Sequence, residues 1–168
     1  MQKELKVTSA QIRAVGEHYV MARLLALGHI VGIAPDNTRS VDLIAMREDG
    51  SKHFQIQVKT RTRGRSSDEG WHMKDKHEEI NTPGLHYVFV ALPENWTDRD
   101  QPETFIIPSA KVAEILKDSH RNWLSTPGAK GQKRRNSKMR RILPKYKDSP
   151  EILSGWMEEF RDNWMVLA

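Results

Sequence analysis

VDLIAMREDGSKHFQIQVKT, which runs from Val41 to Thr60, is the stretch of the chain that decides the fold. It begins with an apolar run, Val41–Met46, and ends with a segment, Phe54–Thr60, in which apolar and polar side chains alternate. Asp49-Gly50 lies between them, and Asp-Gly in this setting is the strongest short-range signal for a β-hairpin. We therefore predict two antiparallel strands joined by a tight turn.

Three polar side chains on this hairpin need an explanation. Successive side chains of a strand point to opposite faces, so Gln57 and Lys59 share one face while Ile56 and Val58 share the other. Asp42 stands among apolar neighbours within the first strand, where an unpaired carboxylate is costly to bury.

The remaining elements follow from the same kinds of pattern. Thr8 and Ser9 are suitable N-caps for a helix that Gly28 ends, and Ser149-Pro150 is typical of the start of another helix. The predicted elements are a helix over 8–27, strands over 30–34, 41–46, 54–60, 86–92 and 104–107, a short helix over 74–80, a helix over 109–124 and a last helix over 150–166. This order predicts an α/β fold with a central mixed sheet flanked by helices, formed by residues 1–168 as a single domain.

The composition is typical of a soluble protein. Hydrophobic residues make up 38% of the 168 residues and charged residues make up 29%. No apolar run approaches the roughly 20 residues of a membrane span. The first six residues contain no apolar stretch of signal-peptide length, so a cytoplasmic location without membrane contact is expected. The absence of cysteine excludes disulfides and thiolate metal sites.

The net charge of +5 originates in one segment. Nine Lys and Arg and no Asp or Glu lie between Lys130 and Lys147, whereas the rest of the chain has 18 basic and 22 acidic residues. We call residues 127–147 the basic segment and predict that it is a loop. Such a segment suits a polyanionic partner, because each phosphate contact releases condensed counterions. Taken alone, such a charge run is more typical of a solvated, partly disordered loop.

Glu17, on the first predicted helix, is a fourth polar residue in an unexpected place. At helical spacing it shares a stripe with Ala14, Val20 and Leu24, which are apolar. A carboxylate on such a stripe is explained if it faces a metal-bound water or a nucleic-acid cleft. The alternative is a solvated acid paired with Arg13, one helical turn earlier.

Together these residues can supply the chemistry of phosphodiester hydrolysis. A metal-dependent reaction needs oxygen ligands for a hard cation, an activated water and positive charge near the phosphate. Asp42 offers a carboxylate, Gln57 an amide oxygen, Val58 a backbone carbonyl and Lys59 an ammonium group. The structural alternatives remain open: Asp42 could form a salt bridge with Arg39 or Lys59, and Gln57 could be a surface residue of an edge strand.

These motifs resemble the PD-(D/E)XK nuclease superfamily, which includes restriction enzymes and archaeal-type Holliday-junction resolvases. The resemblance rests on Gly16-Glu17, Val41–Ala45 and Gln57–Thr60, in that order, and covers residues 8–60. It implies a restriction-endonuclease-like fold, dependence on Mg²⁺ (or Mn²⁺) and cleavage of DNA, with RNA as the other open substrate.

The resemblance also implies a role for each polar residue. Asp42 would bridge the metal, Lys59 would be the catalytic lysine and Glu17 the helix carboxylate. Gln57 takes the position of the second acid, and its neutral amide binds a divalent cation less tightly than a carboxylate does. A non-catalytic nucleic-acid-binding module on the same fold is therefore the alternative function.

Further basic side chains are predicted to contact the nucleic-acid backbone. They are Arg61, Arg63 and Arg65 after the hairpin, and Lys133, Arg134, Arg135, Arg140 and Arg141 in the basic segment. The alternatives are an exposed loop after the hairpin and a basic loop that binds an acidic protein.

An aromatic stripe recurs on the last predicted helix. Trp156, Phe160 and Trp164 are spaced four residues apart, which is typical of core packing. The other interpretation is the seam of a homodimer.

Overall fold

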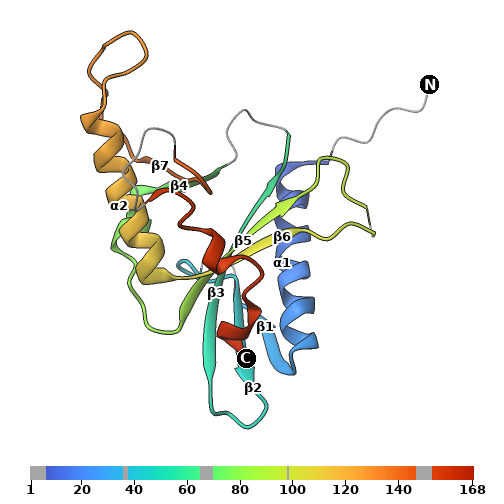
Figure 1. The fold of residues 1–168 in the computed structure, drawn as a ribbon. Coiled ribbons are helices and arrows are strands. Elements are labelled where there is room, and N and C mark those ends of the chain that lie inside the picture. The colour runs from blue at the N-terminus through green and yellow to red at the C-terminus, as the bar shows by residue number, and fades with distance from the viewer. Residues whose placement is uncertain (1–6, 36–37, 65–69, 98, 147–152) are drawn as a thin grey trace, which may run out of the picture.

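The computed structural model describes residues 7–35, 38–64, 70–97, 99–146 and 153–168 (Figure 1). Its elements, in chain order, are α1 (Ser9–Ala26), β1 (His29–Ile33), β2 (Leu43–Arg47), β3 (His53–Thr62), β4 (Trp71–Lys74), the 3₁₀ helix η1 (Asp75–Glu79), β5 (Leu85–Leu92), β6 (Glu103–Pro108), α2 (Ser109–Ser125), β7 (Met139–Ile142), and the 3₁₀ helices η3 (Glu158–Phe160) and η4 (Trp164–Leu167).

A five-stranded sheet forms the centre of the molecule, in the order β1-β2-β3-β5-β6. All neighbours are antiparallel except β3 and β5, which run parallel. The predicted mixed sheet is therefore confirmed. A second, two-stranded antiparallel sheet pairs β4 with β7.

The hairpin of β2 and β3 forms as predicted. Leu43 lies opposite Ile56 and Ala45 opposite Phe54, so the apolar sets of both strands share one face. The strand β2 begins at Leu43, one residue after Asp42. Asp42 extends the ladder by one hydrogen bond, from its N–H to the Ile56 carbonyl at 2.8 Å. It therefore stands where the ladder ends, and not in mid-strand.

Helices cover both faces of the sheet (Figure 1), as the sequence predicted. The helix α1 buries Val20 and Leu24 against the face that carries Ile56 and Val58. On the other face, α2 and the small sheet bury a second core around Tyr87. Two layers of side chains thus hold the strands from opposite sides.

The ends of α1 match the predicted helix 8–27. Thr8 is the N-cap: its side chain accepts a hydrogen bond from the Gln11 N–H, and the Gln11 side chain accepts one from the Thr8 N–H, forming a capping box. After the helix, Gly28 has φ 84°, a left-handed conformation that glycine adopts without a Cβ clash.

The basic segment is not a loop throughout. It contains β7, in which Arg140 lies opposite Met73 of β4. Arg140 is buried and its guanidinium donates to the Glu78 carboxylate. The strand β7 could not be recognised within a run of basic residues, because the acid that neutralises its buried Arg140 is Glu78, far away along the chain.

The helix predicted over 150–166 is wrong. Residues 150–152 lie outside the described part, and 153–166 contain only the short helices η3 and η4. Gly155 and Asp162 have positive φ values of 67° and 48°, which an α-helix does not allow. The Asp162 N–H instead donates to the Thr104 carbonyl at 2.9 Å, so the segment covers the edge strand β6.

The aromatic stripe of this segment is part of the core. Trp156 and Phe160 pack on the α2 side of the sheet, and Trp164 packs on the α1 side. The core-packing interpretation is therefore confirmed without the helix. Trp156 and Trp164 are buried within one chain, and Phe160 is partly buried.

Gly16 sets the distance between α1 and the sheet. A Cβ atom at this position would lie 1.8 Å from Thr60 Oγ1 and 2.8 Å from Thr60 Cβ. Only glycine lets the helix backbone approach β3 this closely. The contact fixes α1 directly over the strand that carries Gln57 and Lys59.

A buried His–Tyr pair lies beneath the same strand. His77 of η1 and Tyr87 of β5 are buried, and His77 Nδ1 lies 2.8 Å from the Tyr87 hydroxyl. Burial, together with the charge of Lys59, lowers the pKa of His77 to about 4. The neutral imidazole is thus the form that fits the fold.

The first prediction concerns the close approach at Gly16. Gly16→Ala should lower the free energy of unfolding by about 1–3 kcal/mol, because the added methyl group overpacks against Thr60. Urea unfolding followed by circular dichroism measures the change. Gly32→Ala is the matched control, since a Cβ there meets nothing within 4 Å. Equal stability of the two variants would show that α1 does not depend on this contact.

The second prediction concerns pH. The unfolded chain protonates His77 near its ordinary pKa of 6.5, whereas the folded chain does so only near 4. Stability should therefore fall as the pH drops from 6.5 to 4, by roughly 2–3 kcal/mol from this residue. His77→Asn keeps a neutral partner for Tyr87 and should flatten the pH dependence relative to the unmodified chain. Parallel curves of unfolding free energy against pH for the two proteins would contradict the prediction that His77 causes this loss of stability.

Candidate active site

Asp42 lies where β2 and β3 separate. Its Oδ2 accepts a hydrogen bond from the Val58 N–H at 2.7 Å and a second from the Gln57 side-chain amide. The carboxylate therefore replaces a backbone acceptor for a buried N–H group. Two hydrogen bonds converge on Oδ2, so Oδ1 is the oxygen left to face a cation.

Two open clefts meet at Asp42. The first, about 440 Å³, is lined by Ser9, Ala10, Arg13, Asp42, Gln57, Val58, Lys59 and Thr60. The second, about 530 Å³, is lined by Ala10, Arg13, Ala14, Glu17, Ile33, Ala34, Pro35, Thr38, Val41 and Asp42. The structure thus brings Asp42, Gln57 and Lys59 to one cleft, while Glu17 lines the adjoining one.

Gln57 is oriented by its hydrogen bond to Asp42. The side chain is buried, and its amide nitrogen donates to the carboxylate. The amide oxygen is consequently the group of Gln57 that can face a cation. The Val58 carbonyl follows it in the chain, and Val58 lines the same cleft.

Glu17 is half-buried on α1, directly after the close approach at Gly16. Arg13 Nε lies 3.9 Å from Glu17 Oε1, so the predicted alternative partner is present at the outer limit of an ion pair. Burial, followed by the charge of Asp42, raises the pKa of Glu17. Two carboxylates that repel each other across a cleft form a place where a cation is stabilised.

The ammonium group of Lys59 interacts electrostatically with Asp42 and Glu17. Burial lowers the pKa of its ammonium group, and the charge of Asp42 opposes this shift most strongly. Lys76 and Arg13 lower it further. Lys59 is therefore easier to deprotonate than an exposed lysine, although it lies beside carboxylates.

The sequence analysis missed two basic residues of this region. Arg13, considered only as a partner for Glu17, lines both clefts. Lys76 of η1 lies close enough to Lys59 to shift its pKa, although η1 is far from the hairpin in the sequence. Helical spacing from Glu17 could have suggested Arg13, whereas no local pattern could have placed Lys76.

The donor set fits Mg²⁺ or Mn²⁺. Asp42, the Gln57 amide oxygen, the Val58 carbonyl and Glu17 offer only oxygen ligands, and Mg²⁺ is commonly held by one or two carboxylates with waters completing the shell. Burial and then the charge of Asp42 raise the pKa of Glu17, and a cation would relieve the second of these effects. Among the described residues, no group of three or more His, Cys, Asp or Glu side chains is placed to hold a metal ion.

The three arginines predicted after the hairpin differ in their surroundings. The guanidinium of Arg61 lies over the buried Trp71 ring, 4.5 Å from its centroid. Arg63 donates to Glu103 of β6. Arg65 falls outside the described residues. Arg61 thus lies in β3 and not in a loop, and both Arg61 and Arg63 have protein partners, so their predicted contacts with phosphates remain a proposal.

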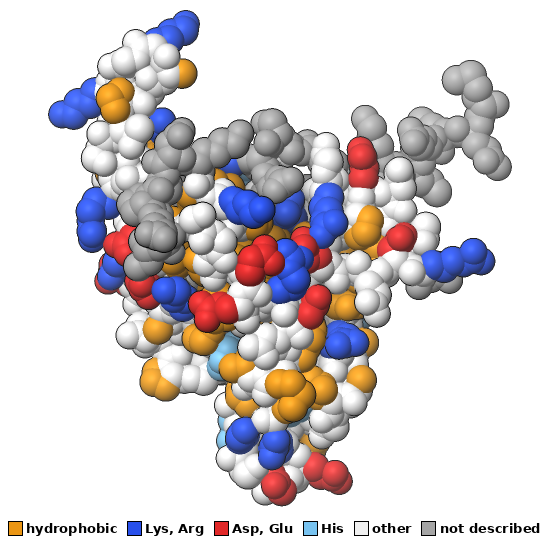
Figure 2. All heavy atoms as spheres, in the orientation of Figure 1, with side chains coloured by type: hydrophobic (Ala, Val, Ile, Leu, Met, Phe, Trp, Pro, Cys, Tyr) orange, Lys and Arg blue, Asp and Glu red, His pale blue; other side chains and the backbone are white. Residues whose placement is uncertain are grey.

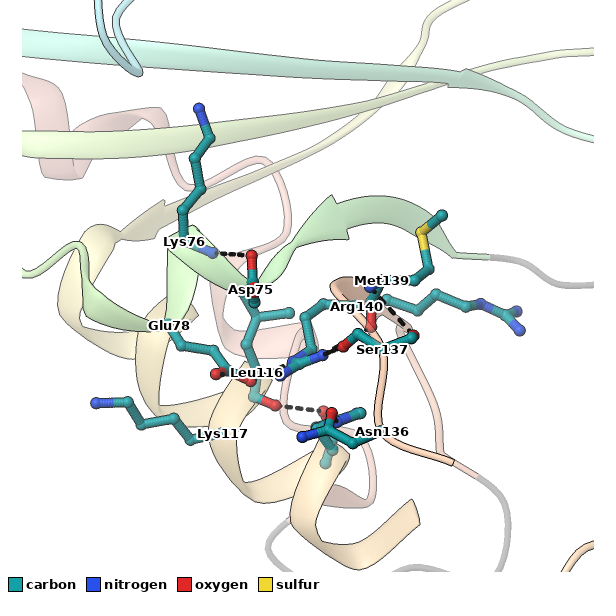
Figure 3. A network of polar contacts seen from close by, with 12 residues as sticks. Asp75, Lys76, Glu78, Leu116, Lys117, Asn136, Ser137, Met139 and Arg140 are labelled. Carbon is teal, nitrogen blue, oxygen red and sulfur yellow. Dashed lines mark hydrogen bonds and ion pairs between the residues drawn. The ribbon is translucent and has the colours of Figure 1, made fainter. Parts of the chain in front are cut away.

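The basic segment divides into anchors and exposed cations. Figure 3 shows Arg140 directed toward Glu78 and Ser137. This residue was predicted to contact nucleic acid, whereas the structure buries it against these protein groups. Lys133 and Arg135 are exposed, whereas Arg134 and Arg141 are half-buried. In Figure 2, Lys and Arg side chains stand on the part that projects beyond α2.

No helix among the described residues has the length and apolar character needed to cross a membrane.

No protein-family model matches the chain, and no curated protein matches it. Among solved structures, a bacterial homing endonuclease, I-Ssp6803I, is similar with a TM-score of 0.47 and 13% identity, over 96% of this chain and 92% of that one. Hjc of Archaeoglobus fulgidus, a Holliday junction resolvase, is similar with a TM-score of 0.42 and 13% identity, over 78% of this chain and 83% of that one. Both of those proteins are nucleases.

Proposed function

We propose that the protein is a metal-dependent DNA endonuclease. One observation carries the proposal: Asp42, Gln57 and Lys59 line a single cleft, and Asp42 joins this cleft to the one that holds Glu17. Carboxylates, an amide oxygen and an ammonium group are the combination that phosphodiester hydrolysis with a hard cation requires.

The residues that would hold Mg²⁺ (or Mn²⁺) are Asp42 through Oδ1, the amide oxygen of Gln57 and the Val58 carbonyl, with Glu17 directly or through water. When bound, the ion supplies Lewis-acid activation and lowers the pKa of a water. Hydrolysis forms a bond from the water oxygen to phosphorus, breaks the bond from phosphorus to the leaving oxygen, and returns a proton to that oxygen.

The chain's own groups position the reactants. Lys59 has a lowered pKa and lies among the same groups, so it can orient the attacking water and accept its proton, or donate to a phosphate oxygen while charged. Asp42 is held by the Val58 N–H, so its free oxygen has a fixed direction.

Positive side chains around the clefts would hold the nucleic-acid backbone. Arg13 lines both clefts, and exposed residues of the basic segment such as Lys133 and Arg135 extend the positive surface. Arg61, Arg63 and Arg65 are weaker candidates, because the first two already contact protein groups and the third lies outside the described residues. A homodimer and an RNA substrate remain compatible with this arrangement, as does a cytoplasmic location.

A non-catalytic nucleic-acid-binding module is the second candidate. The observation that favours it is the hydrogen bond from the Gln57 amide to Asp42, which stabilises the carboxylate without any cation. In that case the cleft would bind phosphates through Lys59 and Arg13 alone.

The third prediction tests cleavage. Purified protein should nick supercoiled DNA with Mg²⁺ or Mn²⁺ and not with EDTA; linear, single-stranded and branched DNA, and RNA, are compared alongside. Asp42→Asn keeps an oxygen for the Val58 N–H but removes the charge, and should reduce the rate by at least about 100-fold, as should Lys59→Ala. Nicking that persists in both variants would identify a contaminant and refute the assignment.

The fourth prediction tests the metal site. Gln57→Glu should tighten Mg²⁺ binding by roughly tenfold in calorimetric titration, because a carboxylate replaces a neutral ligand. Gln55→Glu is the matched control, since Gln55 is an exposed residue of the same strand outside the cleft lining. The second candidate predicts no Mg²⁺ binding by the unmodified chain at millimolar concentrations.

A further inference from the structure

A separate pocket of about 260 Å³ lies between α2 and β7, away from the clefts at Asp42. It is lined by Ser119, His120, Trp123, Ser137, Met139, Arg140, Arg141, Leu143 and Tyr146. Its size is just below the roughly 300 Å³ at which pockets for drug-sized ligands begin, so it suits a single ring system. None of the roles proposed for the Asp42 site uses these residues.

Aromatic side chains form one wall of the pocket. Trp123 is 40% exposed, and His120 stacks on it with ring centroids 5.6 Å apart and planes 17° apart. The Arg134 guanidinium lies over the Trp123 ring, 4.7 Å from its centroid. His120 is held further by Asn136, whose side-chain oxygen lies 2.8 Å from its Nε2. The wall is thus preorganised and still open to solvent.

The floor of the pocket has satisfied polar groups. The Tyr146 hydroxyl donates to the Arg141 carbonyl at 2.9 Å and accepts from the Leu143 N–H at 3.2 Å. Arg140, at the back, is neutralised by Glu78. What the floor offers an occupant is therefore mainly the apolar surface of Leu143 and the Tyr146 ring. A flat ring that is apolar on its faces is the group that fits.

The surroundings of the pocket are strongly positive. The basic segment, which supplies part of the pocket lining, contains four exposed cations: Lys133, Arg135, Lys138 and Lys145. Residues 127–146 contain no acid. Four acids of the neighbouring elements α2 and η1 are paired: Glu78 with Arg140, Glu79 with Lys117, Glu114 with Lys111 and Asp118 with Arg121. The carboxylate of Asp75, the other acid of η1, accepts a hydrogen bond from the Lys76 N–H. The net positive charge at the pocket mouth therefore attracts an anion. A polyanion interacts with it more favourably than a singly charged ligand does.

A flat ring attached to a polyanion is a nucleobase of a nucleic-acid strand. The faces of bases in a duplex are covered by their neighbours, so only an unpaired base can enter such a pocket. An acidic peptide would satisfy the charges, but its carboxylates match neither the apolar floor nor the ring-shaped wall. Charge complementarity and pocket shape together therefore select a single strand over a duplex.

We propose that this pocket binds one unpaired nucleobase of single-stranded DNA, with the exposed lysines and arginines of the basic segment on the flanking phosphates. The proposal rests on the proposed function for the class of ligand, and it deepens that function. It makes the substrate a DNA with an unpaired region, such as a flap, a gap or a branch. The catalytic cleft and the base pocket would contact different parts of it.

The test measures binding without cleavage. Fluorescence anisotropy in EDTA compares a labelled thymidine oligonucleotide of about 12 nucleotides with a duplex of the same length. Trp123→Ala should weaken binding of the single strand by roughly 5- to 100-fold, since stacking on an aromatic side chain contributes about 1–3 kcal/mol per base. Binding of the duplex should change by less than about twofold, because its phosphate contacts remain.

Three further variants separate the effect of stacking from the effects of charge and of loss of fold. Trp96→Ala removes a tryptophan of similar exposure, 37%, outside the pocket lining, and should leave both affinities unchanged. Arg134→Lys keeps the charge but not the planar group over Trp123, and should weaken only the single strand. Thermal unfolding checks that each variant is folded, and Trp123→Phe should keep most of the affinity.

The outcomes distinguish this proposal from the proposed function. Unchanged single-strand affinity in Trp123→Ala would overturn the base pocket even if the protein cleaves DNA, and would leave the pocket to a peptide or to another segment of this chain. Equal losses of affinity for single strand and duplex in Trp123→Ala would also overturn the base pocket, because they would show that Trp123 only stabilises the fold of the basic segment. A selective loss for the single strand would support it whether or not Asp42→Asn abolishes cleavage.

Discussion

The hydrogen bond from the Val58 N–H to the Asp42 carboxylate is the interaction on which the site depends. β2 and β3 must separate for a cleft to open between them, and separation leaves a buried backbone N–H without its ladder partner. Such a group costs about 1–3 kcal/mol when unsatisfied. Asp42 accepts this bond at 2.7 Å, so one side chain both ends the ladder and presents an oxygen to the cleft. Stability and chemistry are coupled at that residue.

The second constraint is the close contact of α1 with β3. Gly16 brings the helix backbone against Thr60, whose neighbour Lys59 points to the opposite face. The next helix residue, Glu17, is thereby carried to the edge of the cleft that Asp42 shares. A larger residue at position 16 would move the carboxylate away from Asp42, which shows how a packing detail sets the spacing of charges.

Local patterns predicted what depends on neighbours in the sequence. The turn at Asp49-Gly50 and the alternation around Gln57 fix the hairpin and the face of its side chains, and the capping residues fix α1. The parts that failed depend on distant partners. Arg140 looks like a solvated cation until β4 and Glu78 fold beside it, and the C-terminal segment loses its helix because the edge of β6 offers hydrogen bonds to Asp162. Lys76 reaches the site for the same nonlocal reason.

The neutral amide of Gln57 has a physical rationale. A glutamate there would add a third acid beside Asp42 and near Glu17, whose pKa is already raised by burial and by Asp42. Without a cation, that cluster would destabilise the end of the β2–β3 ladder. The amide instead donates a hydrogen bond to Asp42 Oδ2, which orients the aspartate side chain. With Gln57 in place of an acid, the site has one negative charge fewer with which to bind a cation. In the proposed function, backbone contacts and the basic segment would therefore carry more of the affinity for a bound phosphate.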